Sequence, residues 1–136
     1  MIYHNILVPI AFDADRDLQA QLSLARRLAA PEARVTLMHV IEQVPSYAIS
    51  YISADYLAEA RSAIRAELQD LAAEIPNARA QVVEGHPGRS IMDWARANKP
   101  DLIIVASHRP GMQDLLLGST AAHVVRSAHC SVHVVR

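Results

Sequence analysis

Three small residues near the end of the chain, Gly118, Ser119 and Thr120, are placed where a phosphate group could bind. An apolar run that precedes them ends at Ala106 and Ser107, and Gly118 to Thr120 open a stretch with apolar residues at helical spacing. A helix N-terminus presents backbone N–H groups that have no partner inside the helix, and small residues let an anion approach them. This spacing predicts a phosphate site. The alternative is an ordinary helix cap, because Ser and Thr are common there.

Short β-branched runs alternate with helical patterns along the chain, which is typical of βαβ units. Continuous apolar runs such as 102–105 indicate strands that are buried on both faces. The sequence therefore predicts an α/β fold, an open five-stranded parallel sheet with helices on both faces and a Rossmann-like arrangement. Strands are predicted at 6–10, 34–41, 80–84, 102–106 and 131–136, helices at 18–30, 54–74, 89–97 and 119–127, a loop at 45–53 and a turn at 85–88.

In such sheets, ligands bind outside the carboxyl ends of the strands, at the point where the strand order reverses. The residues expected there are 9–13 after the first strand and 106–109 after the fourth. Asp13 is a candidate to contact a ribose or a metal ion, and equally a candidate to cap the helix that begins near Asp15. Arg109 could pair with a phosphate through two hydrogen bonds, or remain a solvated loop residue.

Length and composition limit the classes of protein that the chain can belong to. Its 136 residues predict a single domain, and a net charge of −1 argues against a nucleic-acid-binding surface. No charged leader or long apolar run precedes the first strand, so we expect a cytoplasmic protein with no signal peptide and no membrane span. The single cysteine, Cys130, is consistent with a reducing compartment.

Motifs that would indicate catalysis are missing from the sequence. It contains no Walker A lysine, no G-x-G-x-x-G and no G-x-S-x-G. The seven histidines form no helical H-x-x-x-H pair with a carboxylate, so no metal site is predicted. We expect a non-catalytic protein, with weak ATP hydrolysis or autophosphorylation as the remaining alternative.

Over its whole length the chain resembles the universal stress protein family, in particular the small single-domain bacterial F/G type. The resemblance rests on several blocks in the same order: Ile6-Leu-Val-Pro-Ile10, His39-Val40-Ile41, Gly85-x-Pro87-x3-Ile91-x3-Ala95, Ala106-Ser-His-Arg-Pro110, Leu116-Leu-Gly-Ser119, Val124-Val-Arg126, Cys130-Ser-Val132 and Val134-Val-Arg136. It implies a fold like that of the adenine nucleotide alpha hydrolases, a role in the stress response with a protein partner still to be found, and an adenine nucleotide, ATP or AMP with or without Mg²⁺, as ligand.

The resemblance also implies a role for each candidate residue. The phosphates would contact Ala106 and Ser107 after the fourth strand and Gly118, Ser119 and Thr120 at the start of the last helix. A loop that includes His108 and Arg109 would cover the phosphates. Val40 would form an apolar slot for the base together with Pro9 and Ile10, whose alternative role is core packing. The candidate nucleotide site is thus made of Pro9, Ile10, Asp13, Val40, Ala106, Ser107, His108, Arg109, Gly118, Ser119 and Thr120.

The match to the family's nucleotide-binding pattern, Gly-x2-Gly-x9-Gly-Ser/Thr, is incomplete. Ala106 and Arg109 stand where the pattern has its first two glycines, and eight residues from Pro110 to Leu117 stand where it has nine. Ala11 occupies the position at which the family often has an aspartate. The alternative function is therefore a nucleotide-free dimeric interaction module with a degenerate pocket.

The apolar run 132–135 at the end of the sequence predicts a strand at the edge of the sheet. The unpaired backbone groups of such an edge normally have to be covered. The resemblance implies that this strand meets the same strand of a second copy across a two-fold axis. The predicted homodimer interface is Val132, His133, Val134 and Val135.

Overall fold

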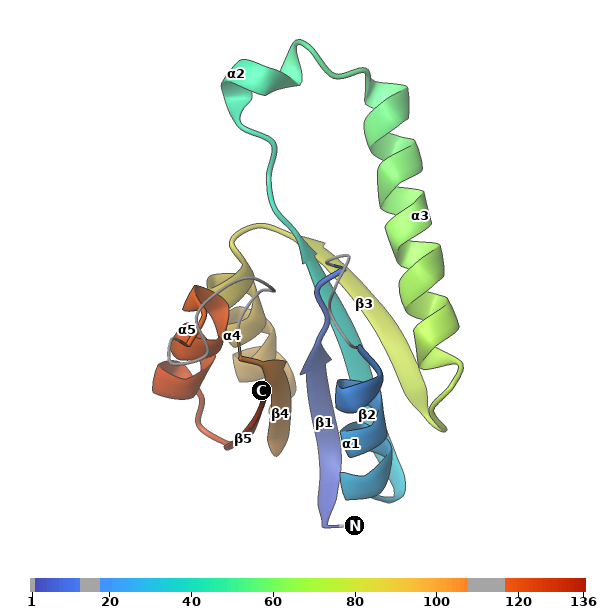
Figure 1. Cartoon of the computed structure of the whole chain (residues 1–136), viewed down its shortest axis with the longest axis vertical. Coiled ribbons are helices and arrows are strands. Elements are labelled where there is room, and N and C mark those ends of the chain that lie inside the picture. The colour runs from blue at the N-terminus through green and yellow to red at the C-terminus, as the bar shows by residue number, and fades with distance from the viewer. Residues whose placement is uncertain (1, 13–17, 108–116) are drawn as a thin grey trace.

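The computed structural model describes residues 2–12, 18–107 and 117–136. Five parallel strands form one sheet in the order β3-β2-β1-β4-β5, which confirms the predicted architecture (Figure 1). The strands are β1 Tyr3–Pro9, β2 Ala29–Ile41, β3 Ala78–Glu84, β4 Leu102–Ala106 and β5 Ser131–Val135. The helices are α1 Leu18–Leu28, α2 Ser46–Ile49, α3 Ala54–Ala72, α4 Pro87–Asn98 and α5 Ser119–Ser127.

The strand order reverses at β1, in the middle of the sheet. The chain first moves outward from β1 through β2 to β3, and then returns to the other side of β1 to form β4 and β5. Helices α1 and α3 cover one face of the sheet, and α4 and α5 cover the other (Figure 1). The carboxyl ends of β1 and β4 therefore lie at the topological switch point, where ligands of such folds bind.

Alternation along the central strands creates two apolar layers. In β1, Ile6 and Val8 pack toward α1 and α3, whereas Leu7 packs toward α4 and α5. In β4, Ile104 packs toward α1 and α3, and Ile103 packs toward α4 and α5. Because successive side chains of a strand point to opposite faces, one continuous apolar run supplies both layers.

The boundary between α1 and β2 differs from the predicted one. The helix ends at Leu28, and Ala29 pairs with Tyr3 of β1 instead of extending the helix. The pairing register then shifts, because Asn5 is opposite Arg34. Glu32 has φ 64° within this irregular part of β2. Strand pairing thus overrides the helical preference of the two alanines at 29 and 30, and α1 ends short of Pro31, the predicted stop.

Helix α4 begins at Pro87, within the segment predicted to be a turn. Proline fits the first turn of a helix because its missing N–H would have no intrahelical partner there. The ring of His86 caps the helix, with Nδ1 accepting a hydrogen bond of 3.2 Å from the amide of Arg89. The predicted loop at 45–53 likewise contains one short helix, α2.

Helix α3 is longer than the sheet that it covers. Its last turns pack on the sheet through Leu68 and Ala72, and its first half extends past the carboxyl ends of the strands (Figure 1). Its half-buried residue Ile64 lies at the level of the strand ends and lines the cavity described below. Among the described residues, no helix is long and apolar enough to span a membrane.

Candidate functional site

A cavity of about 750 Å³ lies at the carboxyl ends of β1, β2 and β4. The N-termini of α4 and α5 also border this cavity. Its volume lies within the range of roughly 300–1,000 Å³ that is usual for small-molecule sites. The position agrees with the site that the strand order predicts.

Backbone hydrogen bonds hold the ends of β1 and β2 together on one side of the cavity. The amide of Ile10 donates to the carbonyl of Met38 at 2.7 Å. The carbonyl of Ile10 in turn accepts a hydrogen bond of 2.7 Å from Nδ1 of His39. Because a carbonyl only accepts, this contact places the proton of a neutral His39 ring on Nδ1.

The predicted base slot is formed by half-buried Pro9 and Val40 together with Ile10, all of which line the cavity. Ile10 is only 3% exposed and also belongs to the core cluster of α1 and α3. Ile10 therefore both lines the cavity and packs in the core.

The other side of the cavity is the junction between β4 and α5. The amide of Ser107 donates to the carbonyl of Val135 at 2.8 Å, which extends the pairing of β4 with β5. The carbonyl of Ser107 accepts a hydrogen bond of 2.6 Å from the amide of Gly118. These two bonds place the end of β4 directly beside the start of α5.

The cap of α5 leaves its first amides available to a ligand. The N-cap residue is Gly118, and no side chain of a described residue makes a capping hydrogen bond at this helix end. The first bond within the helix runs from the amide of Ala122 to the carbonyl of Gly118 at 2.8 Å. The amides of Ser119, Thr120 and Ala121 precede that bond and so have no intrahelical acceptor. The cap residue is therefore Gly118 and neither Ser119 nor Thr120, and an ordinary helix cap remains the alternative to a phosphate site.

The structure brings together every predicted site residue that it describes. All of them line the same cavity, with the β1 and β2 residues on one side and the β4 and α5 residues on the other. The predicted residues Asp13, His108 and Arg109 lie outside the described part of the chain. The lining members are Pro9, Ile10, Val40, Ala106, Ser107, Gly118, Ser119 and Thr120.

Sequence reasoning did not single out several lining residues, although Phe12 lies within the range 9–13 expected at the switch point. Phe12 and His39 form a tilted ring contact with centroids 5.0 Å apart, and both line the cavity. Ile64 reaches the cavity from α3, and His86 does so from the cap of α4. A signal existed for His39, since it is the neighbour of Val40 at the end of the same strand. No motif marks Ile64, which lies near the strand ends only because α3 extends past them.

The charged groups of the described lining are few. It contains no lysine or arginine, and its one carboxylate is Glu42. Among the residues the structure describes, no group of three His, Cys, Asp or Glu side chains is arranged to hold a metal ion. Within this part of the site, the negative charge of a ligand would be met mainly by the backbone amides of α5.

Comparison with known proteins identifies the family. The model of the universal stress protein family matches residues 2–136. The chain belongs to the universal stress protein family. A relative in Coxiella burnetii, universal stress protein A homolog 2, is 34% identical over 145 residues, covering 98% of this chain and 95% of that protein.

Solved structures show the same fold. Hypothetical protein MJ0577 superposes with a TM-score of 0.81 at 21% identity, covering 99% of this chain and 96% of that one. Universal stress protein UspA from Lactobacillus plantarum has a TM-score of 0.71 and is 28% identical, with 98% of both chains covered. The α/β architecture of this chain is therefore that of the family.

Some structural neighbours in the family were solved with nucleotides. A universal stress protein in complex with cAMP is 25% identical, with a TM-score of 0.63 and 98% and 97% of the two chains covered. The universal stress protein of Archaeoglobus fulgidus was solved in complex with dAMP (18% identical, TM-score 0.64, 100% of both chains covered). An Arabidopsis thaliana member has AMP bound (16% identical, TM-score 0.63, 96% and 90% covered).

The predicted dimer residues all lie in β5, at one edge of the sheet. β5 pairs with β4 from Ser131 to Val135, and its other side has no partner strand among the described residues. Val132 and Val135 are half-buried against the two core layers, and His133 is exposed. The structure holds one copy of the chain, so the homodimer stays a prediction.

Proposed function

We propose that this universal stress protein binds an adenine nucleotide, ATP or AMP, in the cavity at the carboxyl ends of β1, β2 and β4. The observation that supports this most strongly is the convergence of the described candidate residues on one cavity. Its volume and its position at the switch point suit a nucleotide. The neighbours solved with cAMP, dAMP and AMP support an adenine nucleotide as the ligand class.

The two sides of the cavity suit the two ends of a nucleotide. Pro9, Ile10 and Val40 offer an apolar surface on which a flat base can pack. The open amides at the start of α5 suit a phosphate, because they donate hydrogen bonds and lie at the positive end of the helix dipole. Arg109, in the loop between β4 and α5, would supply the positive charge that the described lining lacks.

We propose further that the protein acts without catalysis, as a cytoplasmic homodimer that reports nucleotide state to a partner in the stress response. Phosphoryl transfer requires a metal ligand and a positioned nucleophile with a base. The described lining offers one carboxylate, Glu42, and Nδ1 of His39 is bound to a backbone carbonyl. This composition favours a binding protein over an ATPase or an autophosphorylating enzyme.

Calorimetric titration with ATP, ADP and AMP, each with and without Mg²⁺, tests the proposal. We expect saturable heat for at least one nucleotide and a matching rise in melting temperature. Titration with GTP in parallel measures whether the site prefers adenine to guanine. Mass spectrometry of protein denatured directly after purification would identify a nucleotide that copurifies. Absence of heat and of a thermal shift at millimolar nucleotide contradicts the proposal.

The second candidate function is a nucleotide-free interaction module. Three departures from the family pattern favour it: Ala106 in place of a glycine, Ala11 in place of an aspartate, and a spacer of eight residues, 110–117, in place of nine. Under this alternative the cavity would be retained only as a consequence of the fold. A folded dimer that binds its partner equally well with and without nucleotide would support the second function.

A further inference from the structure

A second cavity, of about 390 Å³, lies between α4 and α5 at the opposite end of the sheet. It is bordered by the last turns of both helices and by the segments that lead into β4 and β5. The two cavities share no lining residue. The second cavity is thus a separate feature, and nothing in the proposed nucleotide site accounts for it.

The inner wall of this second cavity is apolar. Ile103 of β4 is 0% exposed and Met92 of α4 is 3% exposed, and both contribute to the wall. Ala95 and Ala128 also line it, and their short side chains leave space between the two helix ends. A cavity with such walls holds water poorly and favours an apolar ligand group.

Two basic side chains, Arg96 and Lys99, line the mouth of the cavity. His129 also lines it, and no acidic residue is among the described lining. Arg96 forms an exposed pair with Asp93 at 2.8 Å. The side chains of Lys99 and His129 make no hydrogen bond or ion pair with any residue that the structure describes.

Of the negative groups near this mouth, Asp93 pairs with Arg96, and Asp101 and the last carbonyls of α4 are hydrogen-bonded to residues of β1. The carboxylate of Asp101 accepts hydrogen bonds from the amides of His4 and Asn5, at 2.9 and 3.0 Å. The last carbonyls of α4, those of Asn98 and Lys99, accept hydrogen bonds from Nδ2 of Asn5 at 2.9 and 3.1 Å. These contacts reduce the negative potential that a helix C-terminus would otherwise place at the mouth.

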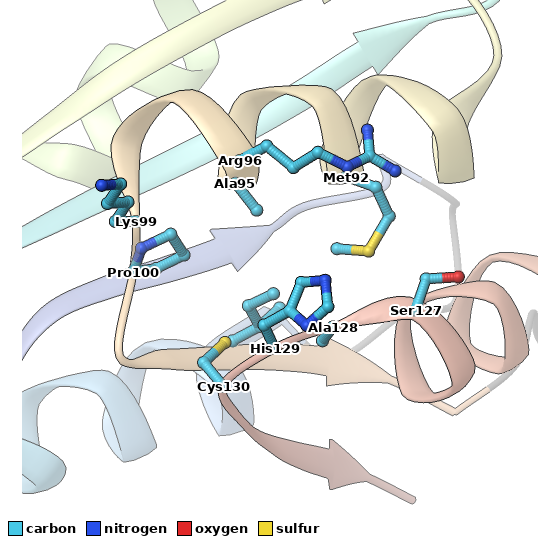
Figure 2. A pocket seen from close by; sticks show the side chains of 10 residues that line it. Met92, Ala95, Arg96, Lys99, Pro100, Ser127, Ala128, His129 and Cys130 are labelled. Atoms are coloured by element: carbon cyan, nitrogen blue, oxygen red, sulfur yellow. The ribbon is translucent and has the colours of Figure 1, made fainter.

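We propose that this second cavity binds a medium-chain aliphatic carboxylate, with its chain against Met92 and Ile103 and its carboxylate at Lys99. Figure 2 shows the arrangement, in which Met92 and His129 face each other across the opening between α4 and the end of α5, and Lys99 stands at the end of α4. A single negative charge on an apolar tail matches a mouth with cations and a wall without polar side chains. A free phosphate matches less well, because it has no apolar group to cover the wall formed by Met92 and Ile103.

The chain contains one cysteine, Cys130, and it lines this cavity, which provides a direct readout. We expect decanoate, below its micellar concentration, to slow modification of Cys130 by N-ethylmaleimide in a saturable manner. Decylamine, which has the same chain and the opposite charge, should protect Cys130 at least about tenfold more weakly. Saturating nucleotide should leave protection by decanoate unchanged, because the two sites share no residue.

Two variants locate the site, and a third is the control. Ala95→Phe should fill the cavity and abolish protection by decanoate. Lys99→Asn removes the charge, and asparagine tolerates the left-handed backbone at this position, where φ is 51°. This variant should bind decanoate about fivefold more weakly, or weaker still, as measured by protection of Cys130. Arg65→Gln removes a positive charge from α3, on the other face of the sheet, and should have no effect.

Three results would overturn the proposal. Equal protection by decanoate and decylamine would show nonspecific adsorption of the chain. Wild-type protection in a folded Lys99→Asn variant would place the carboxylate elsewhere. Protection of Cys130 that rises with protein concentration in the absence of decanoate would show that a second copy of the chain covers the cavity. Because the readout uses no nucleotide, the result is independent of the proposed nucleotide function.

Discussion

The amide of Gly118 and the carbonyl of Ser107 are joined by a hydrogen bond of 2.6 Å. This bond fixes the start of α5 against the end of β4, although residues 108–116 intervene in the sequence. Ser107 also donates its own amide to Val135 at 2.8 Å, so the same residue joins the cavity to the edge strand β5. The proposed phosphate site and the proposed dimer edge therefore share one backbone connection.

Gly118→Glu should weaken nucleotide binding by at least tenfold, which is about 1.4 kcal/mol. Gly118 lines the cavity and is the N-cap of α5, so a carboxylate there would occupy the phosphate volume and repel the phosphate. Its φ of −61° and ψ of 159° are accessible to any residue, so the backbone itself tolerates the change. Titration calorimetry of the variant measures the effect.

Gly118→Gln is the matched control, because it has nearly the same size without the charge. A smaller loss for Gln than for Glu would assign the difference to electrostatic repulsion. If Gly118→Glu is folded and binds nucleotide as the wild type does, the phosphate site lies elsewhere.

Val134→Pro should dissociate the predicted dimer. The carbonyl of Val135 points toward β4, where it accepts from Ser107. Backbone groups alternate along a strand, so the N–H of Val134 points toward the open edge of the sheet. A proline there removes an outward donor and leaves the bonds to β4 in place. Sedimentation at low micromolar concentration should show a dimer for the wild type and a monomer for the variant.

Val135→Pro is the contrasting variant, since it removes a donor that faces β4 and should lower stability as well. A wild-type protein that is folded and monomeric in sedimentation would show that no second copy protects this edge.

Gly88→Ala should destabilise the protein, although alanine is the better helix former. A Cβ at Gly88 would lie 2.9 Å from Cγ and 3.1 Å from Cβ of His123, so α4 and α5 would have to separate. We expect a loss of about 1–3 kcal/mol in the free energy of unfolding, as for other overpacked sites. Urea unfolding of Gly88→Ala, His123→Ala and the double variant measures the coupling.

The His123→Ala change removes the 2.9 Å contact with Cγ and leaves only the 3.1 Å contact with Cβ. In that background Gly88→Ala should therefore cost less than in the wild type, and the helix propensity of alanine offsets part of what remains. Equal losses in both backgrounds would show that the contact with His123 is not the cause.

Cys130 should react with iodoacetamide at a higher pH in the folded protein than in the unfolded chain. Burial raises the pKa of the Cys130 thiol, and the negative charge of Asp101 raises this pKa further. Only the thiolate is alkylated, so the midpoint of the rate against pH should shift upward on folding. A folded-state midpoint equal to or below that in urea would contradict the prediction.

The same pKa shift has a consequence for stability. Above the pKa of the unfolded chain, the unfolded state loses the thiol proton while the folded state keeps it. The free energy of unfolding should therefore fall as the pH rises from the unfolded-state pKa toward the folded-state pKa. Cys130→Ser should remove this part of the alkaline destabilisation, which thermal melts across the alkaline range can detect.

The sequence predicted the sheet because its strands are buried on both faces. The apolar run 102–105 became the buried part of β4, and its neighbours in the sheet followed from the alternation of strands and helices. The errors lie at boundaries where distant contacts or local caps decide. Ala29 joined β2 because Tyr3 pairs with it, and α4 began at Pro87 because His86 caps it.

The predicted site residues that the structure describes line one cavity at the strand ends, and the prediction left out other residues of its lining. Ser107 and Gly118 could be placed from spacing, since a turn after a parallel strand and the start of the next helix meet at the switch point. Ile64 could not be placed, because its position depends on how far α3 extends beyond the sheet. The contact between Phe12 and His39 likewise depends on how the chain turns after β1, which no local pattern records.

The central place of β1 affects how the chain can fold during synthesis. β1 is the first strand made, and its pairing with β4 requires residues 102–103 to meet residues 6–7. Until the ribosome has released that part of the chain, one side of β1, whose residues 6–9 are apolar, has no partner. Such long-range closure is slow, and an open strand edge invites aggregation. The nascent chain should therefore depend on chaperones until residues 102–103 emerge.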